Sequence, residues 1–200
     1  MLGIKCLVSD MEIFSKRKQL KKFSERAPSK ELVQTILRKT FELTPSKQNM
    51  MPYNVHVLDH THTKEKDILY KLSTHSNCYH NYQLKAPYVL LLEPRKVEAT
   101  EHMKSELFEK HGGYLNVRAS DVDVEIGMFA TIFTGLCLEY DIEVSYTKCF
   151  PEFTQLDLLF LESSPTMAIS IGYRIPDRVY KDTRHIKPKL SDVIKWVDSP

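Results

Sequence analysis

One long apolar stretch, from Val122 to Tyr140, constrains the fold of this chain more than any other feature. Ile126, Phe129 and Phe133 recur there at helical spacing, with few charges between them. A helix that is apolar around most of its circumference is buried on several sides. The stretch therefore predicts a central helix, and burial of this kind also suits an interface between two copies of the chain.

Three acidic residues, Asp121, Asp123 and Glu125, stand at the start of this stretch. Negative charge is favourable at a helix N-terminus, where unpaired N–H groups and the helix dipole meet it. We expect all three to cap the central helix.

Composition places the chain among globular proteins of ordinary size. Its 200 residues are 42% hydrophobic and 27% charged, and we expect one domain over residues 1–200. A formal net charge of +2 does not indicate a nucleic-acid partner, and no apolar run has membrane-spanning length. The N-terminus does not read as a secretory signal, and the cysteines form no C-x-x-C pair. These features favour a cytoplasmic protein with reduced thiols.

Helical and strand patterns are interleaved along the chain. A first helix, capped by Ser9 or Asp10, is expected to carry Ile13 and Phe14, and a second follows Ser29. We expect strands around 55–58 and over 86–92 and 165–173, and further helices around 68–72, 97–110 and 153–161. Adjacent strands are not joined by uniform crossover helices, which favours an α+β fold. No G-x-G-x-x-G or Walker loop occurs, so the Rossmann and P-loop classes lack their phosphate-binding element.

The turn between the second helix and the first strand carries the first motif. Ser46 and Asn49 offer hydrogen-bonding groups to whatever lies over this turn, which two prolines punctuate. The stretch resembles the P-S-x-x-N-x-Q-P-W segment of the nitroreductase family, the flavin mononucleotide (FMN) oxidoreductases; it reads Pro45-Ser46-Lys47-Gln48-Asn49-Met50-Met51-Pro52-Tyr53. Met51 stands where the family usually has Gln, and Tyr53 where it usually has Trp.

A basic cluster after the first helix carries the second motif. Taken alone, the cluster is typical of a solvated helix end. It is also similar, without a gap, to the family's R-R-S-x-R-x-F segment, and reads Arg17-Lys18-Gln19-Leu20-Lys21-Lys22-Phe23. The resemblance makes Arg17, Lys18, Gln19 and Lys21 candidate FMN-binding residues. Arg17 would clamp the phosphate with its forked donors, and Lys21 would stabilise the anionic edge of the reduced flavin.

Two further segments extend the resemblance over nearly the whole chain. After the central helix, the stretch from Ile142 to Phe150 aligns with the family segment that faces flavin N5, which places Lys148 and Cys149 there. The family often has glycine at the position of Cys149. The strand over 165–173 ends in the family's G-Y pair, and Lys187 and Lys189 lie where members supply further phosphate contacts.

The resemblance implies a nitroreductase-like α+β fold, with a mostly antiparallel sheet flanked by helices, in an intertwined homodimer that holds FMN between its subunits. It further implies hydride transfer from NADH or NADPH through FMN to an electron-poor acceptor, such as a nitroaromatic or a quinone. The candidate cofactor-binding residues are Arg17, Lys18, Gln19, Lys21, Pro45, Ser46, Lys47, Asn49, Lys148, Cys149, Lys187 and Lys189. No side chain need act as an acid or a base, and no metal is expected.

Alternatives remain open at this point. One is another flavin chemistry on the same fold, such as reductive dehalogenation or flavin breakdown. Another is a non-enzymatic protein that keeps the fold and has lost FMN.

Asn77 and Asn81 are candidates for a contact with the flavin ring. His60 with His62, and Cys78 with His80, could be drawn as metal ligands, but their spacing favours surface histidines.

Overall fold

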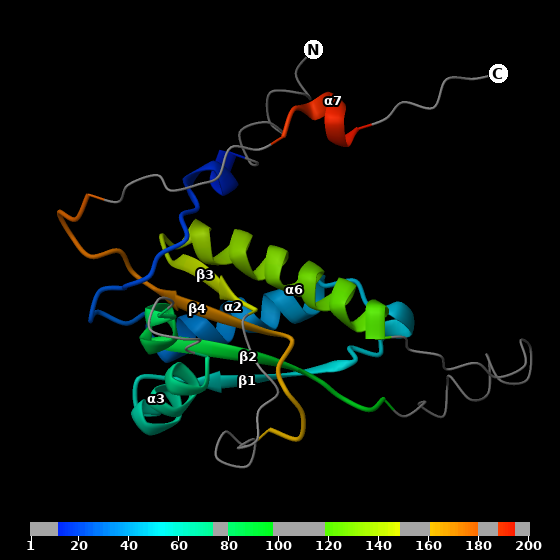
Figure 1. The fold of residues 1–200 in the computed structure, drawn as a ribbon, viewed down its shortest axis with the longest axis horizontal. Coiled ribbons are helices and arrows are strands. Elements are labelled where there is room, and N and C mark those ends of the chain that lie inside the picture. The colour runs from blue at the N-terminus through cyan, green and yellow to red at the C-terminus, as the bar shows by residue number, and fades with distance from the viewer. Residues whose placement is uncertain (1–11, 74–79, 98–118, 149–160, 180–187, 195–200) are drawn as a thin grey trace, which may run out of the picture.

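The structure, a computed structural model, describes residues 12–73, 80–97, 119–148, 161–179 and 188–194 (Figure 1). Four strands form one sheet: β1 (Tyr53–Leu58), β2 (Tyr88–Pro94), β3 (Glu143–Thr147) and β4 (Met167–Gly172). The helices are α2 (Lys30–Leu43), α3 (Thr63–Leu72), α6 (Ala119–Glu139) and α7 (Leu190–Val193), with the short 3-10 helices η1 (Glu12–Lys16), η2 (Lys47–Asn49) and η3 (Tyr82–Lys85).

The sheet has the strand order β1-β2-β4-β3, and every neighbouring pair of these strands is antiparallel. The expected α+β class and antiparallel sheet are therefore confirmed. Several sequence-based predictions fall outside the described residues: the caps Ser9 and Asp10, the residues Asn77, Cys78, Cys149 and Lys187, and nearly all of the predicted helices over 97–110 and 153–161.

The sheet is apolar on both faces, and β2 shows why. Its residues alternate in direction, as in any strand. Tyr88, Leu90 and Leu92 join the core that α2 and α6 form on one face. Val89 and Leu91 join the core that α3 and η3 help to form on the other. A strand that is buried on both faces needs a continuous apolar run, and this run is the one that identified it in the sequence.

The predicted central helix is confirmed as α6, which packs against the sheet and α2 (Figure 1). Phe129 and Phe133 are stacked, with ring centroids 5.9 Å apart, and both are buried. The helix ends in a Schellman turn, in which Ile142 N–H donates to Cys137 O at 3.0 Å. Asp141 provides the left-handed residue of this turn, with φ of 55°, and the chain reverses there into β3.

The second predicted helix is confirmed as α2, together with its cap. Ser29 Oγ accepts a hydrogen bond from Leu32 N at 3.2 Å, and Glu31 lies in the first turn. The first predicted helix is represented, within the described residues, by the single 3-10 turn η1. None of the helices in the described ranges combines the length and the apolar character that crossing a bilayer requires.

Gly172, at the end of β4, allows a close approach of Phe23 and Pro87. A Cβ atom on this residue would lie 2.9 Å from Pro87 Cδ and 3.1 Å from Phe23 Cδ1. Gly172→Ala is therefore expected to lower the free energy of unfolding by about 1–3 kcal/mol, because either ring must move. Urea unfolding measures this loss. Gly127→Ala is the control, since a Cβ there meets nothing within 4 Å and alanine suits a helix interior. Equal losses in both variants would contradict the packing explanation.

Candidate functional site

The basic segment that follows η1 is extended and lies along β3, an edge strand of the sheet. The Gln19 side chain bonds the β3 backbone twice: its Nε2 donates to Tyr146 O at 2.8 Å, and its Oε1 accepts from Tyr146 N at 3.2 Å. A carboxamide carries the same donor and acceptor as a peptide group, so it pairs with the strand as a neighbouring strand would. Next to it, Leu20 N donates to Ser145 Oγ at 2.7 Å. Gln19 and Leu20 of this cluster are thus held on β3, whereas Lys21 and Lys22 are exposed to solvent.

Arg17 is held against the same strand. Its guanidinium carbon lies 5.5 Å from the centroid of the Tyr146 ring, and its Nη1 donates to Gln19 Oε1 at 3.4 Å. The Tyr146 hydroxyl bonds with Thr134 Oγ1 and reaches Ala130 O, so the ring is anchored on α6. Burial raises the pKa of Tyr146, although the hydrogen bond with Thr134 and the charge of Arg17 oppose the rise. The hydroxyl therefore stays protonated at neutral pH.

The other predicted cations lie around this edge or near the C-terminus. The backbone N–H of Lys18 points to Glu143 Oε2 at 3.4 Å, and Lys21 follows Leu20 in the segment that β3 holds. Lys148 is exposed and directly follows the last residue of β3. Lys189 is exposed beside α7. The structure thus gathers Arg17, Lys18 and Gln19 on the strand that leads to Lys148.

The second predicted group, in the turn that includes η2, is bound to α6 through Glu125. Ser46 Oγ donates to Glu125 Oε2 at 2.6 Å, and Lys47 N donates to Glu125 Oε1 at 2.9 Å. Lys47 Nζ also lies 3.1 Å from Asp121 Oδ2. Glu125 is only 3% exposed. Burial raises the pKa of Tyr53, and the negative charge of Glu125 raises it further.

This contact corrects the expectation that Glu125 caps the central helix. Asp121 does lie in the first turn of α6, but Glu125 lies almost two turns in, where backbone N–H groups already have helical partners. Its carboxylate binds the turn of another segment instead. The contact also corrects the expectation that the Ser46 hydroxyl is offered outward, because its single proton is donated to Glu125.

The far side of this turn is held by Arg95, one residue beyond β2. Its Nε donates to Met51 O and its Nη2 to Met50 O, both at 2.9 Å. Met51 and Asn49 have left-handed backbones, with φ of 47° and 54°. The Asn49 residue itself is exposed. The turn is therefore a fixed element whose exposed residues include Pro45, Lys47 and Asn49.

The two predicted groups are not brought together within one chain. The turn contacts α6 at Asp121 and Glu125, whereas Tyr146, which carries Arg17, contacts α6 at Ala130 and Thr134. Nine residues separate Glu125 from Thr134, which corresponds to about 13 Å along a helix.

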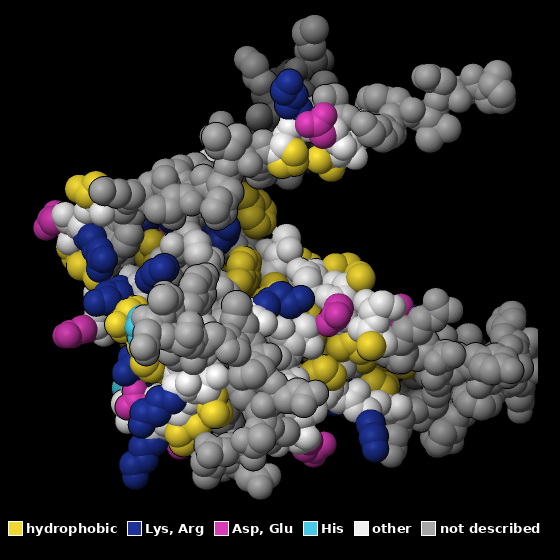
Figure 2. All heavy atoms as spheres, viewed as in Figure 1, with side chains coloured by type: hydrophobic (Ala, Val, Ile, Leu, Met, Phe, Trp, Pro, Cys, Tyr) yellow, Lys and Arg dark blue, Asp and Glu magenta, His cyan; other side chains and the backbone are white. Residues whose placement is uncertain are grey.

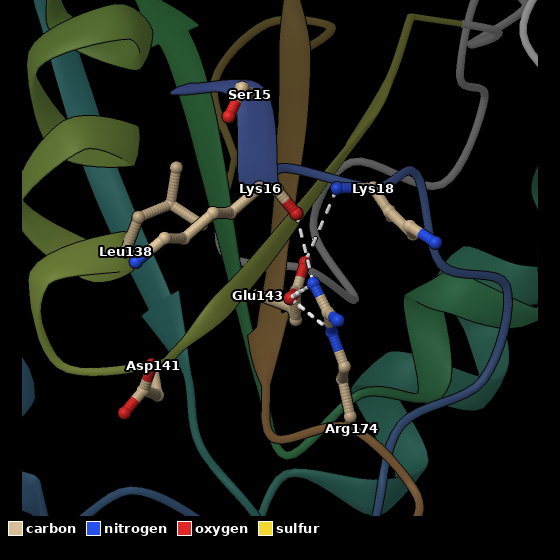
Figure 3. Close-up of a pocket in the computed structure, with 7 residues that line it drawn as sticks. All are labelled: Ser15, Lys16, Lys18, Leu138, Asp141, Glu143 and Arg174. Carbon is tan, nitrogen blue, oxygen red and sulfur yellow. Dashed lines mark hydrogen bonds and ion pairs between the residues drawn. The ribbon is translucent and has the colours of Figure 1, made fainter. Parts of the chain in front are cut away.

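A cavity of about 390 Å³ opens at the other end of β3 (Figure 3). Glu143 lies between the guanidinium of Arg174 and the backbone nitrogen of Lys18, while the Lys18 ammonium points away from it (Figure 3). The other residues that line the cavity are Ser15, Lys16, Leu138 and Asp141. Of the predicted cofactor-binding residues the cavity contains Lys18 alone. The ion pair between buried Glu143 and exposed Arg174 joins β3 to the segment that follows β4, and Arg174 also bonds Lys16 O in η1. We assign the cavity a structural role.

Two other sequence-based candidates are engaged elsewhere. Asn81 is buried; its Nδ2 donates to Ser73 O at 2.9 Å and its Oδ1 accepts from Gln83 Nε2 at 3.1 Å, so it is not free to contact a flavin. His62 pairs with Asp59, with 2.9 Å between Nδ1 and Oδ1. Across the described ranges, no three His, Cys, Asp or Glu side chains gather as a metal site would require.

Sequence reasoning missed Arg95. This residue lies in no recognisable motif and acts on the backbone of a segment distant in sequence. Gln19 was singled out, but as a candidate FMN-binding residue and not as a residue that pairs with a strand. No signal in the sequence alone distinguishes these roles.

Comparison with solved structures completes the description of the fold. A candidate NAD(P)H:FMN oxidoreductase from Staphylococcus epidermidis superposes with a TM-score of 0.74 at 18% identity, over 94% of this chain and 95% of that one. A candidate nitroreductase from Exiguobacterium sibiricum, solved in complex with FMN, gives 0.71 at 19% identity, over 93% and 96%. A nitroreductase family protein from Streptococcus pneumoniae gives 0.64 at 18% identity, over 92% and 98%.

This chain has the nitroreductase fold. The resemblance read from the sequence motifs is thereby confirmed at the level of the fold. No family model matches the sequence, and no curated protein matches it. The nitroreductase fold is thus evident from the structure, and from degenerate motifs that follow the family's order along the chain.

Proposed function

We propose that this nitroreductase-fold protein is an FMN-dependent oxidoreductase. It would take hydride from NADH or NADPH and reduce an electron-poor acceptor such as a nitroaromatic or a quinone. The observation that carries the proposal is the pairing of Gln19 with Tyr146, which fixes the predicted phosphate-binding segment beside the strand that leads to Lys148. The fold shared with a protein solved in complex with FMN supports it.

The side chains of this segment fit an anionic cofactor. Arg17 presents a forked donor whose orientation Tyr146 and Gln19 fix, which suits a phosphate. Lys21 and Lys148 supply exposed cations close to the same edge. Bound FMN would supply the hydride chemistry, while the protein binds, orients and sets the electrostatics. We therefore name cofactor-binding residues and no acid or base.

A homodimer would bring the two separated groups into one site. The turn of one chain and the Arg17 segment of its partner could then contact the same FMN. Exposed apolar side chains support a partner surface: Phe41 is 61% exposed, Leu43 60% and Val124 59%. Figure 1 shows α7 standing apart from the sheet and its helices, and Figure 2 shows apolar side chains at the surface beneath it. Light scattering of the purified protein tests the dimer.

The visible absorption spectrum tests the function. The purified protein is expected to bind FMN, and its flavin band is expected to bleach when NADH or NADPH is added without oxygen. Bound flavin that does not bleach would indicate another electron source or another flavin chemistry. Failure to bind FMN would contradict the proposal.

Removing the predicted phosphate clamp gives the sharpest variant. Arg17→Ala is expected to weaken FMN binding by about 10- to 100-fold, since a hydrogen bond to a charged group contributes about 1.5–3 kcal/mol. Quenching of flavin fluorescence measures the dissociation constant. Arg38→Ala, an exposed arginine on α2, is the control and is expected to bind FMN as the wild type does. Equal affinity for FMN in both variants would show that Arg17 does not contribute to FMN binding.

A second candidate function is a flavin-free protein that keeps the fold. One observation favours it: Ser46 Oγ donates its single proton to Glu125, so this hydroxyl cannot also donate to a flavin. Purified protein that stays colourless after incubation with FMN would establish this candidate.

A further inference from the structure

The turn that includes η2 depends on a buried carboxylate. Glu125 is 3% exposed, and each of its oxygens accepts one hydrogen bond from the turn, from the Ser46 hydroxyl and the Lys47 N–H. A buried charge is costly unless hydrogen bonds compensate it. Here both compensating donors come from the predicted cofactor-binding turn, so the carboxylate and the turn stabilise each other.

The same contact supports a strained backbone. Met51 N donates to Ser46 Oγ at 2.8 Å, so a chain of hydrogen bonds runs from Met51 through Ser46 to Glu125. Met51 has φ of 47°, a left-handed conformation that costs about 1–2 kcal/mol for a residue other than glycine. Strain of this kind persists where the surroundings hold it, and it is frequent at ligand-binding turns.

Arg95 holds the opposite side of the turn. Its guanidinium bonds the carbonyl oxygens of Met50 and Met51, and its own N–H donates to Pro52 O at 3.1 Å. Glu125 binds the start of the turn, and Arg95 binds its end. A turn fixed from both ends needs no ordering when a ligand binds, which favours affinity.

We propose that Glu125 is the positioning residue of this turn: through Ser46 it fixes the backbone from Lys47 to Met51 in the conformation that contacts FMN. The inference rests on the proposed function. It assigns Ser46 an inward role, as the link between Glu125 and Met51, and leaves ligand contact to the exposed Asn49 and to the backbone of the turn.

Two variants test the link. Glu125→Gln keeps the size of the side chain, but an amide offers one acceptor group where the turn supplies two donors, so one contact is lost. Ser46→Ala removes the hydroxyl and leaves Glu125 in place. Each is expected to weaken FMN binding about 10-fold, as judged by flavin fluorescence, for one lost hydrogen bond to a charged group. Because both break the same chain of bonds, the double variant is expected to lose about 10-fold and not about 100-fold.

Asp123→Asn is the matched control, because Asp123 is an exposed acid two residues away on the same helix. It is expected to bind FMN as the wild type does. The visible circular dichroism of bound flavin gives a second readout: a shifted turn alters the flavin band, whereas a general loss of stability does not. Far-ultraviolet circular dichroism checks that each variant is folded, and Ser46→Ala decides alone if Glu125→Gln does not fold.

The outcomes separate the two proposals. Wild-type protein that binds no FMN overturns the proposed function and this inference with it. Wild-type protein that binds FMN, together with variants of unchanged affinity and flavin spectrum, overturns the positioning role alone. Additive losses in the double variant also overturn it, since Ser46 and Glu125 would then act independently.

Discussion

Glu93→Ala is expected to lower the free energy of unfolding by about 3–5 kcal/mol, because it removes the centre of a buried charged network. Glu93 is 1% exposed and lies on β2. One of its oxygens accepts from Glu162 N at 2.5 Å and Ser163 N at 2.6 Å, and the other lies 2.7 Å from His56 Nε2. The substitution would leave the N–H groups of Glu162 and Ser163 without their acceptor. Urea unfolding at neutral pH measures the loss.

The same network makes stability depend on pH. Burial alone raises the pKa of Glu93, but the hydrogen bonds from Ser163, His56 and Glu162 outweigh it and hold the pKa below its usual 4.5. A carboxyl group whose pKa is lower in the folded state stabilises the fold above the unfolded pKa. This contribution is lost as the pH falls below 4.5 and passes through the folded pKa. Unfolding midpoints measured from neutral to acidic pH follow the loss.

Glu162→Gln is the control for both measurements. Glu162 is exposed, and only its backbone N–H takes part in the network, so the variant keeps the contact. It is expected to match the wild type in stability and in its pH profile. If Glu93→Ala and Glu162→Gln had the same free energy of unfolding, the network would contribute nothing to stability.

Phe133→Ala is expected to be similarly destabilising, with a loss of about 3–5 kcal/mol. The side chain is fully buried in the core between α6 and the sheet, and it stacks on Phe129. Truncation would leave a cavity that the close-packed surroundings fill only in part. Chemical unfolding, followed by far-ultraviolet circular dichroism, measures this loss of stability.

Phe133→Leu is the graded comparison, because it keeps most of the apolar volume. It is expected to lose clearly less stability than the alanine variant. A loss of the same size in both would indicate that the aromatic stack, and not the cavity, accounts for the effect. A negligible loss in both would contradict the place of Phe133 in the core.

The sequence predicted those parts of the fold that follow from local pattern. The apolar run over 86–92 identified β2 because both of its faces are buried, and Ser29 identified the start of α2 because a cap is a local contact. The class of the sheet followed from how these elements are interleaved. β3 was not recognised as a strand, because its polar residues Ser145 and Thr147 are buried by pairing with the N-terminal segment and η3.

In the candidate site, only the residues that lie in sequence motifs could be predicted. Arg17, Gln19 and Ser46 were located from their spacing, but their contacts depend on residues more than 75 positions away, such as Glu125 for Ser46. Glu125 looked like one of three acids at a helix start. Its distinction from Asp123 lies in which side of α6 it occupies, and that is decided by how α6 packs, which no local pattern contains.

The pairing of Gln19 with β3 has a consequence for solubility. β3 lies at the edge of the sheet that the described strands form, and an unpaired edge is a template on which other chains add strands and aggregate. The Gln19 carboxamide occupies the backbone N–H and C=O of Tyr146 on this edge, and the Leu20 backbone bonds the side-chain hydroxyl of the neighbouring Ser145. A side chain thus shields the sheet from self-association at the same position where it orders the segment that is proposed to bind a cofactor.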